Sequence, residues 1–291
     1  MDKQTFSRYG SIVAVVLVLS LMIAFATPFG SFVVGGVKNL LFSFNSTAID
    51  KLTNPDVDVT IGGGGSANLP AGGEVDPATG EILDSWEVII NNVNNGTYAT
   101  KYAVGNYKPL DLGSEGVVNM QIAALDADIL SDGSGNAHIT WIAKELLTSI
   151  HTMNDTSTNA DGWAASGMRA YLQNDVWSLI PANVQNAIVA VDKTYFDYTT
   201  SSTLTCSDKV WMPSFREVCG GTNFETSGVI YSGIFANSAS LIKKLNSSVS
   251  TWWLRTAVIV DGSGFASIDG GGSAIYSYAH YSNGIALSFC F

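Results

Sequence analysis

Thr251–Thr256 reads TWWLRT and Ile285–Phe291 reads IALSFCF, and these two apolar stretches decide how the C-terminal part of the chain folds. Both are short and rich in aromatic or branched side chains, which is typical of buried β-strands. Residues 263–284 lie between them and read SGFASIDGGGSAIYSYAHYSNG, where glycine, serine and tyrosine replace the apolar pattern. We expect the tryptophan pair to fill the core beneath this stretch, and Arg255 to satisfy carbonyl groups or a carboxylate there.

Towards the N-terminus the pattern mixes helical and strand periodicity. The expected elements are a helix capped by Asp84-Ser85 with Trp86, Ile89, Ile90 and Val93 on one face, a hairpin of strands 118–124 and 137–143, a helix over 166–177, a helix from Pro181 to Val191, and short strands at 210–212, 251–256 and 285–291. This order predicts an α+β fold with one core over residues 84–291.

The composition favours an exported protein that recognises ligands by hydrogen bonds and aromatic contacts. Only 13% of the residues are charged, and the formal net charge is −11. No cluster of Lys and Arg is present in the sequence, so a nucleic-acid partner is not expected. Asn, Ser, Thr and Tyr take the place of the missing charges, as they do in many recognition surfaces.

Residues 1–44 predict a hydrophobic helix. Ser11–Phe25 is almost continuously apolar and follows Lys3 and Arg8, which predicts a cytoplasmic N-terminus and export of the rest. Three interpretations remain open: a retained membrane anchor, which we favour; a signal peptide cleaved after the Ala-Phe-Ala site at residues 24–26; and a pilin-type segment after Gly10. Type IV pilins carry a Glu where this chain has Val15, so the third likeness is partial.

Residues 45–83 predict a linker. They contain Gly62-Gly63-Gly64-Gly65-Ser66, three prolines and little apolar periodicity. Such a segment would hold the head of residues 84–291 away from the membrane, with the head extracellular.

The sequence gives little reason to expect catalysis, a cofactor or a metal ion. Its three histidines, His138, His151 and His280, accompany no nucleophile motif, and no His/Cys metal spacing occurs. Among the three cysteines, Cys206 and Cys219 are the nearest pair, so a disulfide between them stays open as an alternative to free thiols.

The last 36 residues, from Thr256 onwards, contain no Lys, Glu, Gln, Met or Trp, although these types supply 34 of the 291 residues. At that rate roughly four would be expected. None of the five can be encoded by a codon that ends in a pyrimidine. Most residues present can be reached from Asn codons by changes at the first two bases, which indicates a surface that varies.

Five phrases together resemble an uncharacterised bacterial surface-domain family found in gut Gram-positive bacteria and their mobile elements. They are LDLGSEG from Leu110, DGWAASGMRAYL from Asp161, DKVWMPSFREV from Asp208, TWWLRTA from Thr251 and SNGIALSFCF from Ser282. The resemblance covers about residues 85–291. The C-terminal block is also similar to the C-type-lectin-like fold of formylglycine-generating-enzyme relatives and of the variable proteins of diversity-generating retroelements.

The resemblance implies a C-type-lectin-like head whose diversified C-terminal loop binds an extracellular protein or glycan. The expected ligand-binding residues are Ala266, Ser267, Asp269, Ser273, Ile275, Tyr276, Ser277, Tyr278, His280 and Tyr281. One alternative is a pilin-like subunit that assembles through the N-terminal helix and displays the head on a filament. A second is an enzyme like the formylglycine-generating enzymes, but these use a cysteine pair where this chain has Cys290 alone.

Overall fold

The computed structural model describes residues 72–221, 225, 228–259 and 262–291, which belong to a compact unit that spans Leu69–Phe291. The predicted hydrophobic helix of residues 1–44 and most of the predicted linker lie outside the described residues. No helix within the described ranges has the length and apolar character needed to cross a bilayer.

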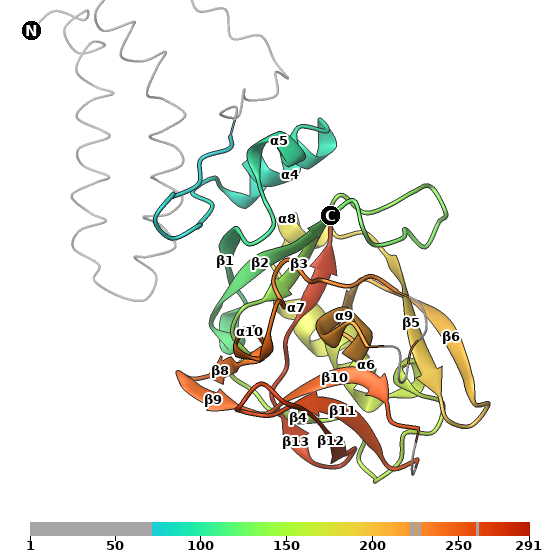
Figure 1. Ribbon diagram of the computed structural model, residues 1–291. Helices are drawn as coiled ribbons and strands as arrows, with labels where there is room; N and C mark the ends of the chain where they lie inside the picture. The colour runs from blue at the N-terminus through green and yellow to red at the C-terminus, as the bar shows by residue number, and fades with distance from the viewer. Residues whose placement is uncertain (1–71, 222–224, 226–227, 260–261) are drawn as a thin grey trace, which may run out of the picture. The chain divides into compact units, whose positions relative to one another are not determined.

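Two β-sheets form the centre of this unit (Figure 1). The larger sheet has the strand order β1-β2-β3-β14-β7, and the smaller has the order β10-β11-β12. The strands of the larger sheet are β1 (Tyr107–Asp111), β2 (Val117–Leu125), β3 (Ile139–Ala143), β14 (Ser288–Cys290) and β7 (Val210–Trp211). Those of the smaller are β10 (Trp252–Ala257), β11 (Gly264–Ile268) and β12 (Ala274–Tyr278). The last strand, β14, is thus central in its sheet, because it pairs with β3 on one side and β7 on the other.

Three two-stranded ribbons complete the β-structure. They are β5 (Val191–Asp197) with β6 (Ser202–Asp208), β8 (Lys243–Leu245) with β9 (Ser248–Ser250), and β4 (His151–Thr152) with β13 (Ser282–Asn283).

The helices are short. The α-helices are α4 (Trp86–Asn94), α5 (Tyr98–Lys101), α6 (Gly167–Tyr171), α7 (Trp177–Leu179), α8 (Ala182–Gln185), α9 (Phe215–Cys219) and α10 (Ser238–Leu241). The 3-10 helices are η1 (Gly113–Glu115) and η2 (Trp163–Ala165), and η3 (Leu172–Val176) is a π-helical turn.

Strand β10 is buried at every position from Trp252 to Ala257. Side chains alternate between the two faces of a strand, and the two faces of β10 meet different apolar clusters. Trp252 and Leu254 join a cluster with Ile142 and Tyr231, whereas Trp253 joins the main cluster with Phe289. The prediction that the tryptophan pair fills the core is confirmed.

The predicted α+β class, with an N-terminal hydrophobic helix and a C-type-lectin-like head, is wrong for this structure, because the described residues form mainly β-sheet with few short helices. The helix expected over 166–177 is interrupted by the π-turn η3. The helix expected from Pro181 ends at Gln185, and Val191 starts strand β5. After Gln185, Val189 bridges Cys290 and Val191 pairs with Asp208 of β6, so pairing with distant segments overrides the helical spacing of the apolar side chains.

Other expectations agree with the structure. Helix α4 begins after Ser85, whose side chain accepts a hydrogen bond from the Val88 N–H. The expected hairpin is β2 with β3. Residues 72–83, which we assigned to the linker, instead lie within the compact unit: Val75 bridges Ile82, and Ile82 is fully buried.

Candidate functional site

Four aromatic side chains gather on the surface at the end of β12 and in the turn that follows it. We call Tyr276, Tyr278, His280 and Tyr281 the aromatic cluster. All four are exposed, and the tyrosines have exposed fractions of 49%, 39% and 51% in sequence order. Aromatic rings with this exposure are accessible to contacts from outside the molecule.

Tyr278 lies at the centre of the aromatic cluster. Its ring centroid is 6.1 Å from that of Tyr276, 6.1 Å from that of His280 and 5.6 Å from that of Tyr281. His280 and Tyr281 also contact each other edge to face, at 4.7 Å. Ring pairs at these distances attract one another, so the cluster forms one continuous aromatic surface.

Tyr276 also has a packing role inside the sheet. Its ring lies over Gly264 of β11, since a Cβ added to that glycine would stand 3.4 Å from the Tyr276 Cδ2 atom and 2.5 Å from the Ser277 carbonyl oxygen. An aromatic side chain that covers a glycine on the neighbouring strand stabilises the pairing. Tyr276 is therefore the member of the cluster most closely tied to the scaffold.

The structure separates the other predicted binding residues into buried and exposed groups. Ala266 and Ser267 lie on β11 and are buried, and the Ser267 hydroxyl is 3.0 Å from that of Ser277. These residues lie on the strand beside β12, with Ala266 opposite Tyr276 and Ser267 opposite Ile275. Because they do not reach the surface, the candidate site is narrower than the predicted set.

Of the remaining predicted residues, Asp269 and Ser273 lie in the turn between β11 and β12, and Ile275 and Ser277 lie on β12. Asp269 accepts hydrogen bonds from the backbone N–H groups of Gly271 and Ser273, so its carboxylate holds its own turn together. Ser273 and Ile275 are exposed beside it. Because side chains alternate along β12, Ile275 faces the side of the strand opposite to Tyr276 and Tyr278.

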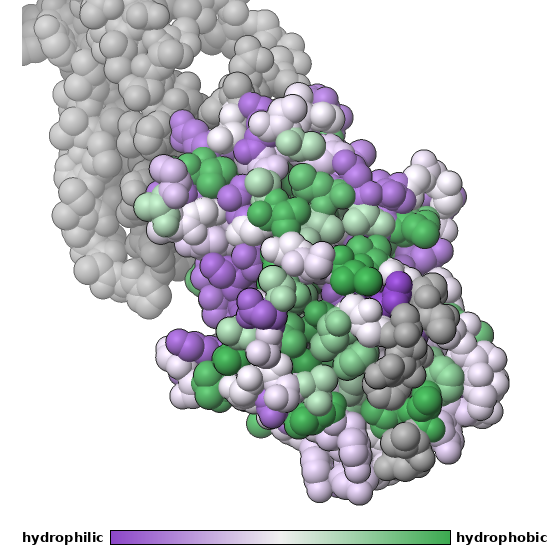
Figure 2. Space-filling model, viewed as in Figure 1, coloured by the Kyte–Doolittle hydropathy of each residue, from purple (hydrophilic) through white to green (hydrophobic). Residues whose placement is uncertain are grey.

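Figure 2 shows that apolar and polar side chains are interspersed on one face of the molecule. Single exposed apolar residues also occur in the described part of the chain far from β12 in sequence, such as Leu83 and Val117. Scattered exposure of this kind is ordinary on protein surfaces. What singles out the aromatic cluster is that its exposed rings contact one another.

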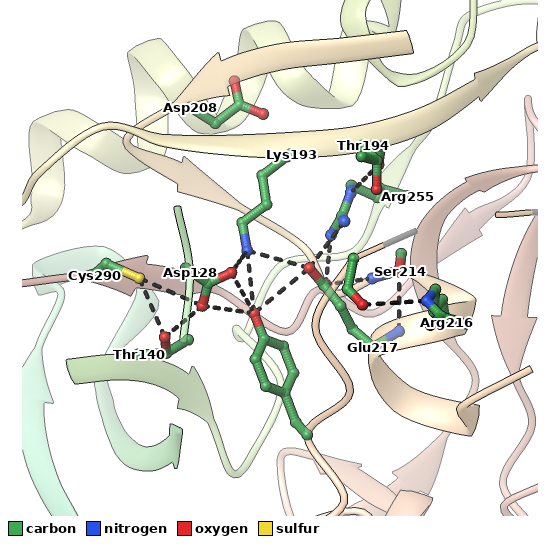
Figure 3. Close-up of polar contacts among 12 residues, drawn as sticks. Asp128, Thr140, Lys193, Thr194, Asp208, Ser214, Arg216, Glu217, Arg255 and Cys290 are labelled. Carbon is green, nitrogen blue, oxygen red and sulfur yellow. Dashed lines mark hydrogen bonds and ion pairs between the residues drawn. The ribbon is translucent and has the colours of Figure 1, made fainter. Parts of the chain in front are cut away.

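A group of buried ionisable side chains from β5, β10, α9 and two loops is drawn in Figure 3. We call Asp128, Lys193, Glu217, Tyr231 and Arg255 the buried ion cluster; each is at most 2% exposed. Arg255 makes a two-pronged pair with the carboxylate of Glu217, and its Nη1 atom donates to the Met212 carbonyl oxygen. The prediction that Arg255 satisfies carbonyl groups and a carboxylate is confirmed.

The buried charges set each other's protonation. Burial alone would raise the pKa of Glu217, but the positive charges of Arg255 and Lys193 outweigh it and lower the pKa to about 2. Burial would lower the pKa of Lys193, yet the carboxylates of Asp128 and Glu217 raise it above its ordinary value. The cluster is therefore a compensated set of charges within the core.

Apart from Arg255, the buried ion cluster is not predicted from the sequence. One signal was available: Lys193 stands between Val191 and Tyr195 at a spacing of two along β5, and all three face inward. A Lys at an inward position of an alternating strand indicates a buried partner. Asp128 carries no such signal, because it follows β2 in an irregular segment.

The three cysteines are free, so the Cys206–Cys219 disulfide that the sequence left open is not formed. Burial, followed by the nearby Asp208 carboxylate, raises the pKa of Cys206 to about 12. Burial also raises the pKa of Cys290 well above its ordinary value. Thiols in this state are poor nucleophiles at neutral pH. Within the described residues, no group of three or more His, Cys, Asp or Glu side chains is placed to hold a metal ion.

Residues 138–290, more than half of the chain, match a family model described as a domain of unknown function, DUF6273. The matched region includes the aromatic cluster and every member of the buried ion cluster except Asp128. No curated protein and no solved structure matched the chain. On the strength of the family match, the chain belongs to the DUF6273 family.

Proposed function

We propose that this chain is a cell-surface binding protein, that its C-terminal aromatic cluster contacts an extracellular protein or glycan, and that its role is recognition and not catalysis. The observation that carries the proposal is the exposure of four aromatic rings at the end of β12 that are joined through Tyr278. Tyrosine supplies a broad apolar face and a hydroxyl group while it loses little rotamer freedom on binding.

The scaffold below the cluster supports this role. β12 pairs with β11 along its whole length, and β11 pairs with the fully buried β10. After β12 the chain turns back, and the Ala279 carbonyl oxygen accepts from the N–H groups of Met153 and Asn154. Side chains on such a rigid support keep their arrangement before a ligand arrives, which lowers the entropic cost of binding.

We further propose that the exposed positions vary between relatives as those of a diversity-generating retroelement target do, and that the apolar segment of residues 11–25 tethers the chain to the membrane. The codon-limited composition after Thr256 supports the first part. The positive charges that precede the apolar segment support the second. A near-copy of the 3′ end beside a reverse-transcriptase gene is the genomic signature that tests the retroelement.

The binding role is tested with the full chain against a glycan array and a displayed library of random peptides. The variant Tyr278→Ser/Tyr281→Ser removes two rings of the cluster, and Tyr198→Ser, which is 40% exposed beside the end of β5, is the matched control. We expect the double variant to lose the binding that the control keeps. Equal binding by the two variants, or no binding by the unmodified chain, would contradict the proposal.

A further inference from the structure

Lys193 and Asp128 face each other inside the protein at the distance of a very short ion pair. The Lys193 Nζ atom, from β5, lies 2.5 Å from the Asp128 Oδ1 atom, which belongs to the segment after β2 (Figure 3). The exposed fractions of the two residues are 1% and 2%. An amide bond forms from an amine and a carboxyl group, and here these two groups are held together and away from water.

We propose that these side chains condense, so that the mature protein carries a covalent amide cross-link between Lys193 and Asp128. A bond forms between Nζ and the Asp128 Cγ atom, and the bond between Cγ and Oδ2 breaks. The ammonium nitrogen gives two of its three protons to the departing oxygen, which leaves as one molecule of water. No oxidant, reductant or other reactant is required.

Hydroxyl groups are placed to assist both the attack of nitrogen on the carboxyl carbon and the transfer of protons to the departing oxygen. Thr140 Oγ1 donates to Asp128 Oδ2 at 2.5 Å. The Tyr231 hydroxyl lies 2.9 Å from the same oxygen and 3.0 Å from Oδ1. Donors so placed stabilise negative charge that develops on the oxygens when nitrogen attacks the carbon.

Tyr231 also links the nitrogen to the leaving oxygen. Its hydroxyl lies 3.1 Å from Lys193 Nζ, so a proton can pass from the nitrogen through this hydroxyl to the Asp128 carboxylate. Glu217 Oε1, which is 3.1 Å from Nζ, holds the amine on its other side. Fixed proximity of this kind replaces the encounter that two free reactants need.

The surroundings favour the neutral product. Lys193 and Asp128 are almost fully buried, and charges in such an interior carry a desolvation penalty. Condensation removes one positive and one negative charge from the core. Arg255 and Glu217 remain as a compensated pair. On the surface, water would instead stabilise the two ions and preserve the ion pair.

A second buried lysine provides the comparison. Lys243 is 5% exposed, and its Nζ atom donates to the carbonyl oxygens of Ala143 and Lys144. The carbonyl of a backbone amide is a poorer electrophile than that of a carboxylic acid. No condensation is therefore expected at Lys243. The variant Lys243→Met therefore serves as a control for a buried lysine without a carboxyl partner at hydrogen-bond distance.

The experiment is the intact mass of the purified full-length chain, measured after denaturation. We expect a mass lower than the sequence mass by one water, and a branched proteolytic peptide that joins the segments around residues 128 and 193. A chain at its full sequence mass, or a water loss that maps to other residues, would overturn the proposal.

Variants test the assignment. Lys193→Met should restore the full mass, whereas Lys243→Met should retain the loss of one water. Tyr231→Phe removes the hydroxyl that relays the proton, so the cross-linked fraction should rise more slowly in a time course after refolding. If the water loss persists in Lys193→Met, the bond is elsewhere and the proposal fails. If that variant does not fold, the peptide map of the unmodified chain still decides the question.

Discussion

Arg255 on β10 and Glu217 on α9 join the smaller sheet to the helix beside it through two hydrogen bonds, of 2.5 Å from Nη1 to Oε2 and 2.9 Å from Nη2 to Oε1. Glu217 also caps the N-terminus of α9. Its carboxylate accepts a hydrogen bond from the Ser214 N–H, and the Ser214 hydroxyl accepts one from the Glu217 N–H. One carboxylate thus caps α9 and neutralises a buried guanidinium.

Removal of that carboxylate charge should destabilise the protein strongly. In Glu217→Gln the guanidinium of Arg255 stays buried without its anion, and loss of one partner of a buried pair typically costs about 3–5 kcal/mol. The free energy of unfolding from urea titration measures the effect. Glu74→Gln, at an exposed position, is the control and should lie near the unmodified protein. A similar small change in both variants would show that the pair contributes little.

The same carboxylate predicts a loss of stability in acid. The pKa of Glu217 in the folded protein, about 2, lies below the value of 4.5 expected in the unfolded chain. The unfolded chain therefore takes up the proton first. The stabilisation is present above about pH 4.5 and is lost as the pH falls from there towards 2. Urea midpoints across this range should fall for the unmodified protein and fall less for Glu217→Gln; parallel curves would contradict the assignment.

Lys243 predicts a pH dependence in the alkaline range. Burial lowers its pKa to about 7 from an ordinary value of 10.5. Between these values the unfolded chain holds a proton that the folded protein has released, so this residue destabilises the fold progressively less as the pH rises from about 7 to 10.5. The stability advantage of Lys243→Met over the unmodified protein should therefore shrink across this window. An advantage that is constant with pH would show that Lys243 does not titrate there.

The sequence was most informative where a residue's type and its periodicity agreed. Trp253 and Arg255 stand in an apolar stretch bounded by a glycine-rich segment, and their buried roles follow from that pattern. The exposure of Tyr278 and His280 likewise fits a segment in which large aromatic residues alternate with small ones and are not flanked by large apolar residues.

Prediction was least successful where distant segments decide the outcome. Residues 181–191 have helical apolar spacing, but Val191 pairs with β6 and begins a strand. Ala266 and Ser267 look like surface residues by composition, yet β10 and β12 enclose them on both sides. The meeting of Asp128 with Lys193 depends on contacts across 65 positions, which no local pattern encodes.

Substitutions in the aromatic cluster should leave the stability of the fold almost unchanged. Tyr278→Ser/Tyr281→Ser changes exposed side chains, and such changes usually shift the free energy of unfolding by about 0.5 kcal/mol or less. Trp253→Ala removes a fully buried ring and should cost roughly 3–5 kcal/mol. Thermal and urea unfolding of the three proteins measure both effects. If the double variant loses as much stability as Trp253→Ala, the tyrosines belong to the core and not to a binding surface.

Gly272 shapes the turn that leads into β12 and presents the aromatic cluster. Its φ angle is +80°, and a Cβ atom added there would stand 2.0 Å from the Ser238 carbonyl oxygen. Gly272→Ala therefore combines an unfavourable backbone conformation with a clash against backbone, and we expect a loss of about 1–3 kcal/mol. Gly271→Ala is the matched control, because Gly271 does not have a left-handed φ and an added Cβ there would lie 3.3 Å from a side-chain oxygen of Asp269 and not against backbone. Urea unfolding separates the two, and equal stabilities would show that the turn can relax away from α10.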